Sequence, residues 1–290
     1  MRRLSIYFII LVSLGKLYAQ EELLALLDDA PSDDYVSATF KSTRLVNGHT
    51  VEIRSPKVLE FVIGHRFGRA NTGSEQFWGL DNATIRLGLE YGLAKNLTLG
   101  IGRASFDKVI DTYAKYRFIR QSSKSPVTVT GLGSITFASD PGLDIARSHR
   151  SDYTTQVLIA RKFTSNLSLQ LMPTFIQRKL VPTVEDANAL IALGIGGRFK
   201  VSNRVSINGE YYPQLTEFNN DRFNSFAIGV DIETGGHVFQ LHLTNAEQMT
   251  EQGFVGETRD DFFKGDIHFG FNISRVFDLG AQGKKSDSYQ

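Results

Sequence analysis

Residues 83–93 read ATIRLGLEYGL, and this stretch alternates between apolar and polar or small residues with a period of two. In an extended chain, Ile85 and Leu87 share one face, while Arg86 and Glu90 share the other. About ten such residues in a tilted strand cross the hydrocarbon core of a bilayer. The stretch therefore predicts a transmembrane β-strand with one face toward lipid and the other toward water.

The same alternation recurs in twelve segments that together occupy residues 57–277. We expect strands at approximately 57–67, 81–93, 96–105, 109–119, 126–137, 152–163, 166–177, 188–200, 203–213, 222–232, 236–244 and 264–277. An even number of strands closes a barrel with both chain ends on one side of the membrane. The predicted fold class is all-β, a closed antiparallel transmembrane β-barrel of about 12 strands. Fourteen is the alternative, in which residues 36–53 add two strands to the wall.

Short and long connections alternate between these segments. Asn96, Asn166, Asn203 and Thr234–Gly236 mark tight turns, because Asn and Gly tolerate the left-handed backbone that such turns demand. The long connections are at 68–80, 138–151, 178–188, 215–222 and 245–263. Outer-membrane barrels show this asymmetry, with the short turns in the periplasm. A soluble β-sandwich or lipocalin-like barrel would also alternate in polarity, but the loop asymmetry and the charged, glycine-containing polar face favour the membrane barrel.

The two ends of the chain differ from the barrel pattern. Residues 1–19 have two arginines directly after Met1, continue through an apolar run at 4–14 and end on Ala19, which is typical of a cleavable signal peptide. The apolar run is shorter than the roughly 20 residues of a transmembrane helix. We therefore expect export to the outer membrane. Residues 278–290 are mostly polar and are predicted to form a disordered tail.

Residues 20–56 form a predicted helix and hairpin segment. Glu21 to Asp29 has leucines at helical spacing, and Asn47-Gly48 lies between two short β-prone runs. A lone two-stranded hairpin is only marginally stable in water. A barrel of twelve strands is wider than its own interior side chains can fill. We therefore expect the segment to pack into or across the periplasmic mouth as a plug.

Composition excludes several classes of function. The chain has no cysteine, which removes disulfides and thiolate metal sites, and 32 Lys and Arg against 31 Asp and Glu give no basic surface for nucleic acid. The G-x-S-x-G and H-E-x-x-H motifs are absent. We expect no catalytic residues, no metal and no cofactor, and the chain is not predicted to be an enzyme.

Charged residues on the polar faces are the candidate site. We expect mixed signs to pair and brace the wall. The candidate lumen-facing charges are Glu60, Arg66, Arg86, Glu90, Asp111, Lys115, Arg117, Arg198, Glu210, Asp231, Asp266 and His268. Two hypotheses follow: a narrow channel or uptake barrel for a small solute, or a closed membrane scaffold that presents loops or periplasmic segments to a periplasmic protein partner. Lipid of the outer membrane is the surrounding partner in both.

Several stretches carry a resemblance to a known family. They are TFKSTRLVNGH from Thr39, EFVIGHRFG from Glu60, FWGLDNA from Phe77, YGL from Tyr91 and GIGRAS from Gly100. Together they resemble an uncharacterised family of outer-membrane β-barrel proteins from the Bacteroidetes, over about residues 39–120. The resemblance implies an exported barrel and brings no catalytic residue.

Overall fold

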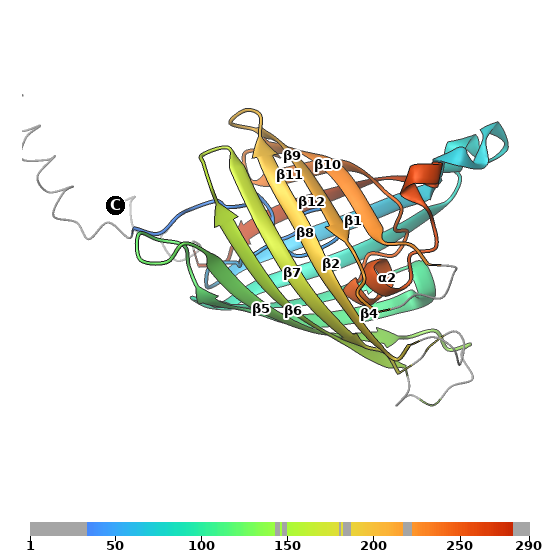
Figure 1. Cartoon of the computed structure of the whole chain (residues 1–290), viewed down its shortest axis with the longest axis horizontal. Helices are drawn as coiled ribbons and strands as arrows, with labels where there is room; N and C mark the ends of the chain where they lie inside the picture. Colours follow the sequence, from blue (N-terminus) through green and yellow to red (C-terminus); the bar gives the residue numbers. More distant parts are fainter. Residues whose placement is uncertain are drawn as a thin grey trace, which may run out of the picture. The chain divides into compact units, whose positions relative to one another are not determined.

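The computed structural model describes residues 34–142, 146, 150–179, 181, 187–216 and 222–280. Within these residues twelve strands form one closed barrel in sequence order, with β12 paired to β1 (Figure 1). The strands are β1 (Val58–Arg69), β2 (Ala83–Ala94), β3 (Leu97–Ala104), β4 (Val109–Ile119), β5 (Thr128–Ala138), β6 (Ser151–Lys162), β7 (Leu167–Gln177), β8 (Ala189–Lys200), β9 (Val205–Tyr212), β10 (Ser225–Thr234), β11 (His237–Thr244) and β12 (His268–Asp278). The predicted fold class and strand number are confirmed. The predicted signal peptide, the helix at 21–29 and residues 281–290 of the predicted tail lie outside the described residues.

Every neighbouring pair of strands is antiparallel, and the register keeps like faces together. Ile63 of β1 is paired with Leu87 of β2 on one side and with Ile273 of β12 on the other. Residues 36–53 are not part of this ring, and their one isolated bridge joins Arg44 to His49 within the segment itself. The wall therefore closes with twelve strands, and the fourteen-strand alternative is not found.

The two faces of the wall separate by polarity as the alternation predicts. In β2, Leu87 is 49% exposed and Leu89 is 42% exposed, whereas Arg86 is 4% and Glu90 is 1% exposed. A ring of strands leaves no unpaired edge, so the backbone N–H and C=O groups of the wall are satisfied even where lipid surrounds it. Among the described residues, no helix combines the length and the apolar composition that crossing a membrane requires.

The tight turns form without the backbone conformation expected for asparagine. None of Asn96, Asn166 and Asn203 has a positive φ, whereas Gly235 and Gly236 have φ of 45° and 109°. In two of the asparagine turns, a hydroxyl closes the turn instead. Thr164 Oγ1 accepts hydrogen bonds from the N–H groups of Asn166 and Leu167, and Ser202 Oγ accepts in the same way from Arg204 and Val205. The positions of the turns were predicted correctly, but the reason given for asparagine was wrong.

All connections from an odd strand to the next even strand lie at one end of the barrel, which we call the long-loop end. They carry the short helices η1 (Ala70–Thr72), η2 (Ser74–Gly79), η3 (Phe106–Lys108), α2 (Glu251–Gly256) and η5 (Phe262–Lys264). Every residue of α2 is buried, and the ring of Phe254 packs 5.0 Å from that of Tyr212 on β9. The β11–β12 connection therefore folds inward at this end.

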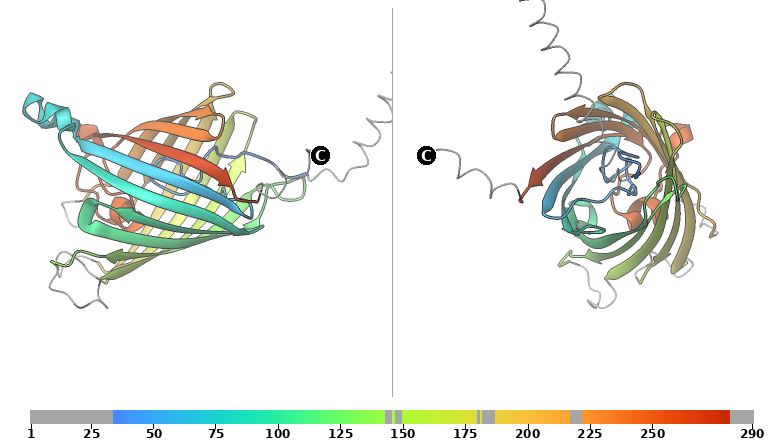
Figure 2. Two further views of the ribbon diagram at one scale, coloured as in Figure 1. Left: turned by 180° about the vertical axis from the view of Figure 1, so that it is seen from behind. Right: turned by 90° about the vertical axis from the view of Figure 1, so that its left-hand side faces the viewer.

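The largest buried cluster lies inside the barrel. Residues 36–56, which we call the hairpin segment, lie within the ring of strands (blue in Figure 2, right). The apolar cluster joins the hairpin segment, α2 and the inner faces of β6 to β9; its larger members are Phe40, Leu45, Val51, Leu158, Met172, Ile176, Leu190, Tyr212, Phe254 and Val255. The apolar residues of the inner face thus gather on β6–β9, where Arg198 and Glu210 lie among them, while most of its charges lie on β1–β4. The sequence pattern did not predict this division.

Candidate functional site

The hairpin segment reverses direction at residues 45–48, deep inside the lumen. The N–H of Leu45 donates to the carbonyl of Gly48 at 2.8 Å, and the N–H of Thr50 donates to the carbonyl of Thr43 at 2.9 Å. Gly48 does not have a positive φ, so the turn is not centred on Asn47-Gly48 as the sequence indicated. The turn is one residue earlier, and a group on the wall stabilises it.

That group is the carboxylate of Glu210 on β9. It accepts hydrogen bonds from three successive backbone N–H groups, those of Val46 at 3.3 Å, Asn47 at 2.6 Å and Gly48 at 3.1 Å. Consecutive N–H groups that point to one place form an anion-binding concavity, and hydrogen bonds to an ionised acceptor are stronger than neutral ones. Glu210 therefore fixes both the shape of the turn and its place against the wall.

Two carboxylates on neighbouring strands meet a single hydroxyl of the hairpin segment. Thr43 Oγ1 lies 3.1 Å from a carboxylate oxygen of Glu60 and 3.0 Å from one of Glu90. A hydroxyl carries one proton, so it donates to one of the two carboxylates at a time. Arg54 Nε lies 2.9 Å from Glu60, and the hydroxyl of Tyr113 donates to Glu90 at 2.8 Å. The charge of Arg54 and the hydroxyl donors compensate two acidic groups that would otherwise repel each other.

Cations of the wall bind the hairpin segment mainly through its carbonyl groups. Lys115 Nζ on β4 donates to the carbonyl of Glu52, and Arg198 Nη1 on β8 donates to that of Thr39 at 3.4 Å. Arg66 Nη2 on β1 donates to the side-chain oxygen of Asn47 at 2.7 Å. Main-chain carbonyl groups of the hairpin segment thus bind two of these three wall cations, and a side-chain amide binds the third.

The other predicted site residues have partners within the wall or its connections. Arg86 pairs with Asp111 through two hydrogen bonds, one of them 2.9 Å long. Asp231 accepts from Gln240 at 2.6 Å. All four of these side chains and the side chain of His268 are buried.

Three of the predicted lumen-facing residues differ from the others in their location, their burial or their partner. His268 Nε2 lies 2.7 Å from a carboxylate oxygen of Asp260, in the β11–β12 connection. Arg117 on β4 is only half-buried. Asp266 lies before β12 and not on a strand, where it accepts a hydrogen bond from Asn71. Its inclusion among wall charges was wrong, because the predicted strand began four residues too early.

Uncharged wall residues also bind the hairpin segment. Gln170 on β7 accepts from the N–H of Val51 at 2.9 Å and donates to the carbonyl of His49 at 2.8 Å. Asn272 on β12 donates to the carbonyl of Val46 at 2.9 Å. Both residues lie on the polar faces of their strands, so the alternation that predicted the lumen-facing charges also predicts these two side chains to face the lumen.

The hairpin segment also contacts the long-loop end. Arg44 Nη1 donates to a carboxylate oxygen of Glu251 in α2 at 2.9 Å, and the ring nitrogen Nε2 of His49 lies 3.3 Å from the same oxygen. Nothing in the hydrophobic alternation predicted this contact, because its residues are 207 positions apart. The hairpin segment thus enters the lumen from the tight-turn end and α2 from the long-loop end, and the two segments are in contact.

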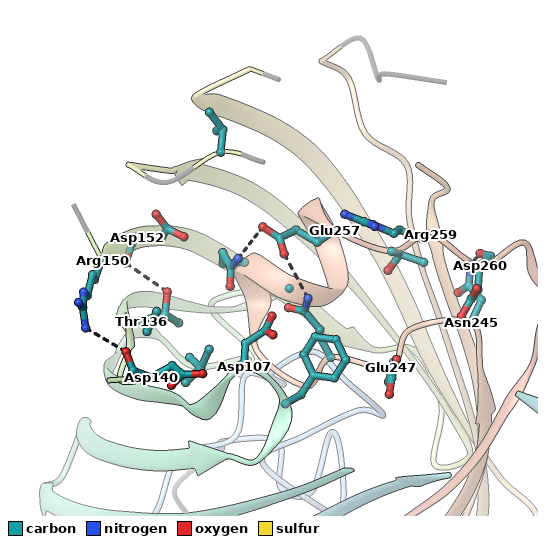
Figure 3. A pocket seen from close by; sticks show the side chains of 18 residues that line it. Asp107, Thr136, Asp140, Arg150, Asp152, Asn245, Glu247, Glu257, Arg259 and Asp260 are labelled. Carbon is teal, nitrogen blue, oxygen red and sulfur yellow. Dashed lines mark hydrogen bonds between the residues drawn. The ribbon is translucent and has the colours of Figure 1, made fainter. Parts of the chain in front are cut away.

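A cavity of about 730 Å³ lies at the long-loop end and is lined in part by Gln252 and Gly253 of α2 (Figure 3). We call it the mouth cavity. Its lining includes two arginines, Arg150 and Arg259, and more carboxylates than these can neutralise. The acidic lining residues are Asp107, Asp140, Asp152, Glu247, Glu257 and Asp260. They come from the β3–β4, β5–β6 and β11–β12 connections and from the start of β6. The described lining of the mouth therefore has an acidic balance.

Two of these carboxyl groups have altered acidity. Partial burial raises the pKa of Asp107, with repulsion from Glu257 as a smaller cause. Partial burial also raises the pKa of Glu247. No set of three His, Cys, Asp or Glu residues within the described ranges is placed to hold a metal ion.

Comparisons with known proteins complete this description. The chain is similar to the solved structure of the NanC porin, with 11% sequence identity and a TM-score of 0.48 over 75% of this chain and 98% of that chain. It is similar to the KdgM porin with 9% identity and a TM-score of 0.47 over 76% of this chain and 99% of that chain. It is also similar to the outer membrane phospholipase A from Escherichia coli, with 11% identity and a TM-score of 0.42 over 78% of this chain and 92% of that chain. Among curated proteins, none matches. The model of one family, described as "Membrane bound beta barrel domain (DUF5777)", matches residues 40–277, which include all but the first four residues of the hairpin segment and nearly the whole ring of strands. The chain belongs to this family of membrane-bound β-barrel domains.

Proposed function

We propose that this chain is an outer-membrane channel for a small solute, in which the hairpin segment is a plug that must move before solute passes. The observation that carries the proposal is the way the plug is held. On the β1–β4 side and at Glu210, its contacts are hydrogen bonds and ion pairs to charged wall residues. Water can replace such contacts, so even hydrogen bonds to charged groups contribute only about 1.5–3 kcal/mol each to stability.

The apolar contacts of the plug have the opposite character. Phe40, Leu45 and Val51 pack against the β6–β9 side, and exposing them to water would cost about 25 cal/mol per Å². This side favours the closed state, while the polar side leaves a lumen wall that water can wet once the plug has moved. A barrel that stayed closed permanently would gain little from so many buried charges, because apolar residues of similar volume are often at least as stabilising.

The sidedness of the proposed channel follows from the connections. Tight turns in outer-membrane barrels face the periplasm and long loops face outward. The plug precedes β1 and therefore enters from the tight-turn end, on the proposed periplasmic side. The mouth cavity then opens on the outer side, where it would receive the solute.

A tethered plug tests the proposal. The chain has no cysteine, so a single engineered pair is unambiguous. A Cβ atom added at Gly229 on β10 would lie 3.4 Å from Cγ2 of Val46, which is near the sulfur-to-Cβ separation across a disulfide. We expect the double variant Val46→Cys/Gly229→Cys to stay closed in planar bilayers when oxidised. After reduction it should show voltage-dependent openings like those of the unaltered protein.

Each cysteine alone is the matched control, and heat-modifiable migration in gels reports that all variants fold. The proposal that the barrel is a channel is wrong if no form conducts at any voltage, that is, if the reduced pair, the single variants and the unaltered protein all stay closed. The closed scaffold that presents segments to a periplasmic protein partner would then be the better assignment. If the oxidised pair opens as often as the reduced pair, the barrel conducts but residues 36–56 are not its plug.

A further inference from the structure

A second, much smaller cavity lies where the hairpin segment meets β1 and β2. Its volume is about 20 Å³, and its lining includes the guanidinium-bearing residues Arg44, Arg66 and Arg86 together with Asn47 and Asn272. Three arginines from three separate segments thus border one space. Like charges repel, so such an arrangement is unfavourable unless negative charge lies close to all three.

The carboxylates of the described residues compensate the three arginines unequally. Arg86 is paired with Asp111, and Arg44 with Glu251. Arg66 is 1% exposed, yet within the described part of the chain no carboxylate oxygen lies within 4 Å of its guanidinium; its acceptors are amide and carbonyl oxygens, at 2.7 to 3.4 Å. A buried cation whose only acceptors are neutral is poorly compensated.

Two donors at this cavity have no acceptor. Arg44 Nη2 and Arg66 Nε are both buried, and no hydrogen-bond partner for either exists among the described residues. Each side chain uses its other nitrogen atoms for the contacts given above. Buried donors are almost always satisfied, so one acceptor lying between Arg44 and Arg66 would resolve both.

The size of the cavity limits what that acceptor can be. About 20 Å³ corresponds to a single water-sized sphere. A carboxylate, phosphate or sulfate is too large. A water molecule would fit and accept two hydrogen bonds, but it would leave Arg66 with only the more distant carboxylate of Glu210 as a counter-charge. A monatomic anion supplies both the acceptor and the charge.

We propose that one halide ion, chloride under ordinary conditions, binds between Arg44, Arg66 and Arg86 and links the hairpin segment to the wall. Arg44 belongs to the hairpin segment, while Arg66 and Arg86 belong to β1 and β2. The ion therefore stabilises the barrel only while the hairpin segment occupies the lumen. This site is independent of whether the barrel conducts.

The test uses the full barrel in detergent at constant ionic strength, with chloride exchanged for gluconate, which is too large for the cavity. We expect the urea midpoint of unfolding to rise with chloride, and each tenfold increase above the dissociation constant to raise the folded-to-unfolded ratio about tenfold. Crystals grown in bromide should show an anomalous peak within hydrogen-bonding distance of Arg44 and Arg66.

Arg66→Met removes the guanidinium but keeps an unbranched side chain, and it should abolish both the chloride dependence and the bromide peak. Arg198→Met is the matched control, because Arg198 also donates to the hairpin segment but does not border this cavity. It should lower stability and keep the chloride dependence. Equal midpoints in chloride and gluconate, together with no bromide peak in the unaltered protein, would show that water occupies the cavity and would overturn the proposal. An unchanged chloride dependence in Arg66→Met would overturn it as well.

Discussion

The outer and inner faces of the same strands differ in how far each position depends on one particular residue. On the outer face, Leu89 lies among Phe61 and Ile101 of the neighbouring strands, and any of these apolar side chains could serve in the place of another. On the inner face, Glu210 and Gln240 each bind particular atoms of a segment more than 160 residues away. The outer face needs only a type of residue, whereas the inner face needs particular residues at particular positions.

The largest expected effect comes from replacing one residue of a buried ion pair on the inner face. Asp111→Leu leaves the guanidinium of Arg86 buried without its carboxylate, which should cost about 3–5 kcal/mol of unfolding free energy. Thr112→Leu introduces the same side chain at the next residue, on the exposed outer face, and should leave stability unchanged or slightly raised. Urea unfolding in detergent or lipid measures both. Equal losses from the two variants would contradict the division between the faces.

A charge on the outer face should have an effect that depends on depth. Leu89 is in the middle of β2, and Leu93 is near its end at the tight turn. Leu89→Arg should cost about 2–4 kcal/mol, and Leu93→Arg about 0–1 kcal/mol, because an arginine near the interface reaches water. Unfolding from lipid vesicles gives the two values. Similar costs at both positions would mean that this surface does not face a bilayer core.

Removing the carboxylate at the turn of the hairpin segment should have a smaller and more local effect. Glu210→Ala leaves three backbone N–H groups without their acceptor, which should cost about 1–3 kcal/mol. Hydrogen exchange at Val46, Asn47 and Gly48 should accelerate more than exchange in the wall. Glu233→Ala is the control, because Glu233 is 38% exposed and its pair with Lys41 should contribute less than about 1 kcal/mol. Unchanged exchange at the turn in Glu210→Ala would show that the carboxylate does not hold it.

The smallest effect is the pH dependence of the mouth cavity. The pKa values of Asp107 and Glu247 are raised in the folded barrel, so the folded state binds their protons more readily than the unfolded state does. Their contribution to stability is fully present below the unfolded-state pKa values and is lost as pH rises through the raised ones. This contribution taken alone should raise the unfolding midpoint slightly on acidification, whereas Asp140, which lines the same cavity and has a lowered pKa, acts in the opposite direction. Asp107→Asn/Glu247→Gln should remove that contribution, and an identical slope in this variant would contradict it.

The parts that could be predicted from the sequence are those set by local periodicity. A period of two along β2 gives the outer and inner residues without knowledge of any neighbour, because alternate side chains point to opposite faces. The strand count followed from the same pattern. The apolar inner residues Met172 and Ile176 could not be foreseen, since the buried cluster they belong to also contains Phe40 and Val51, far away in the chain.

The candidate site was predictable in part for the same reason. Glu60 and Glu90 were found as charges on a polar face, but that Thr43 lies between them depends on where the hairpin segment goes. The turn at residues 45–48 shows this most clearly. Local sequence favoured a turn centred on Asn47-Gly48, but the carboxylate of Glu210 binds three successive N–H groups, and the turn is one residue earlier.

The position of the hairpin segment inside the ring constrains the order of assembly. Its contacts involve Glu60 in the first strand and Asn272 in the last, so they cannot all form until the strands of both chain ends are in place. The segment is also joined directly to β1, whose pairing with β12 closes the ring. Either it is already inside when that seam forms, or it enters afterward through the tight-turn end. The earliest-synthesised residues of the described chain are thus among the last to reach their final contacts, and until then they must be kept from pairing with the unpaired edges of β1 and β12.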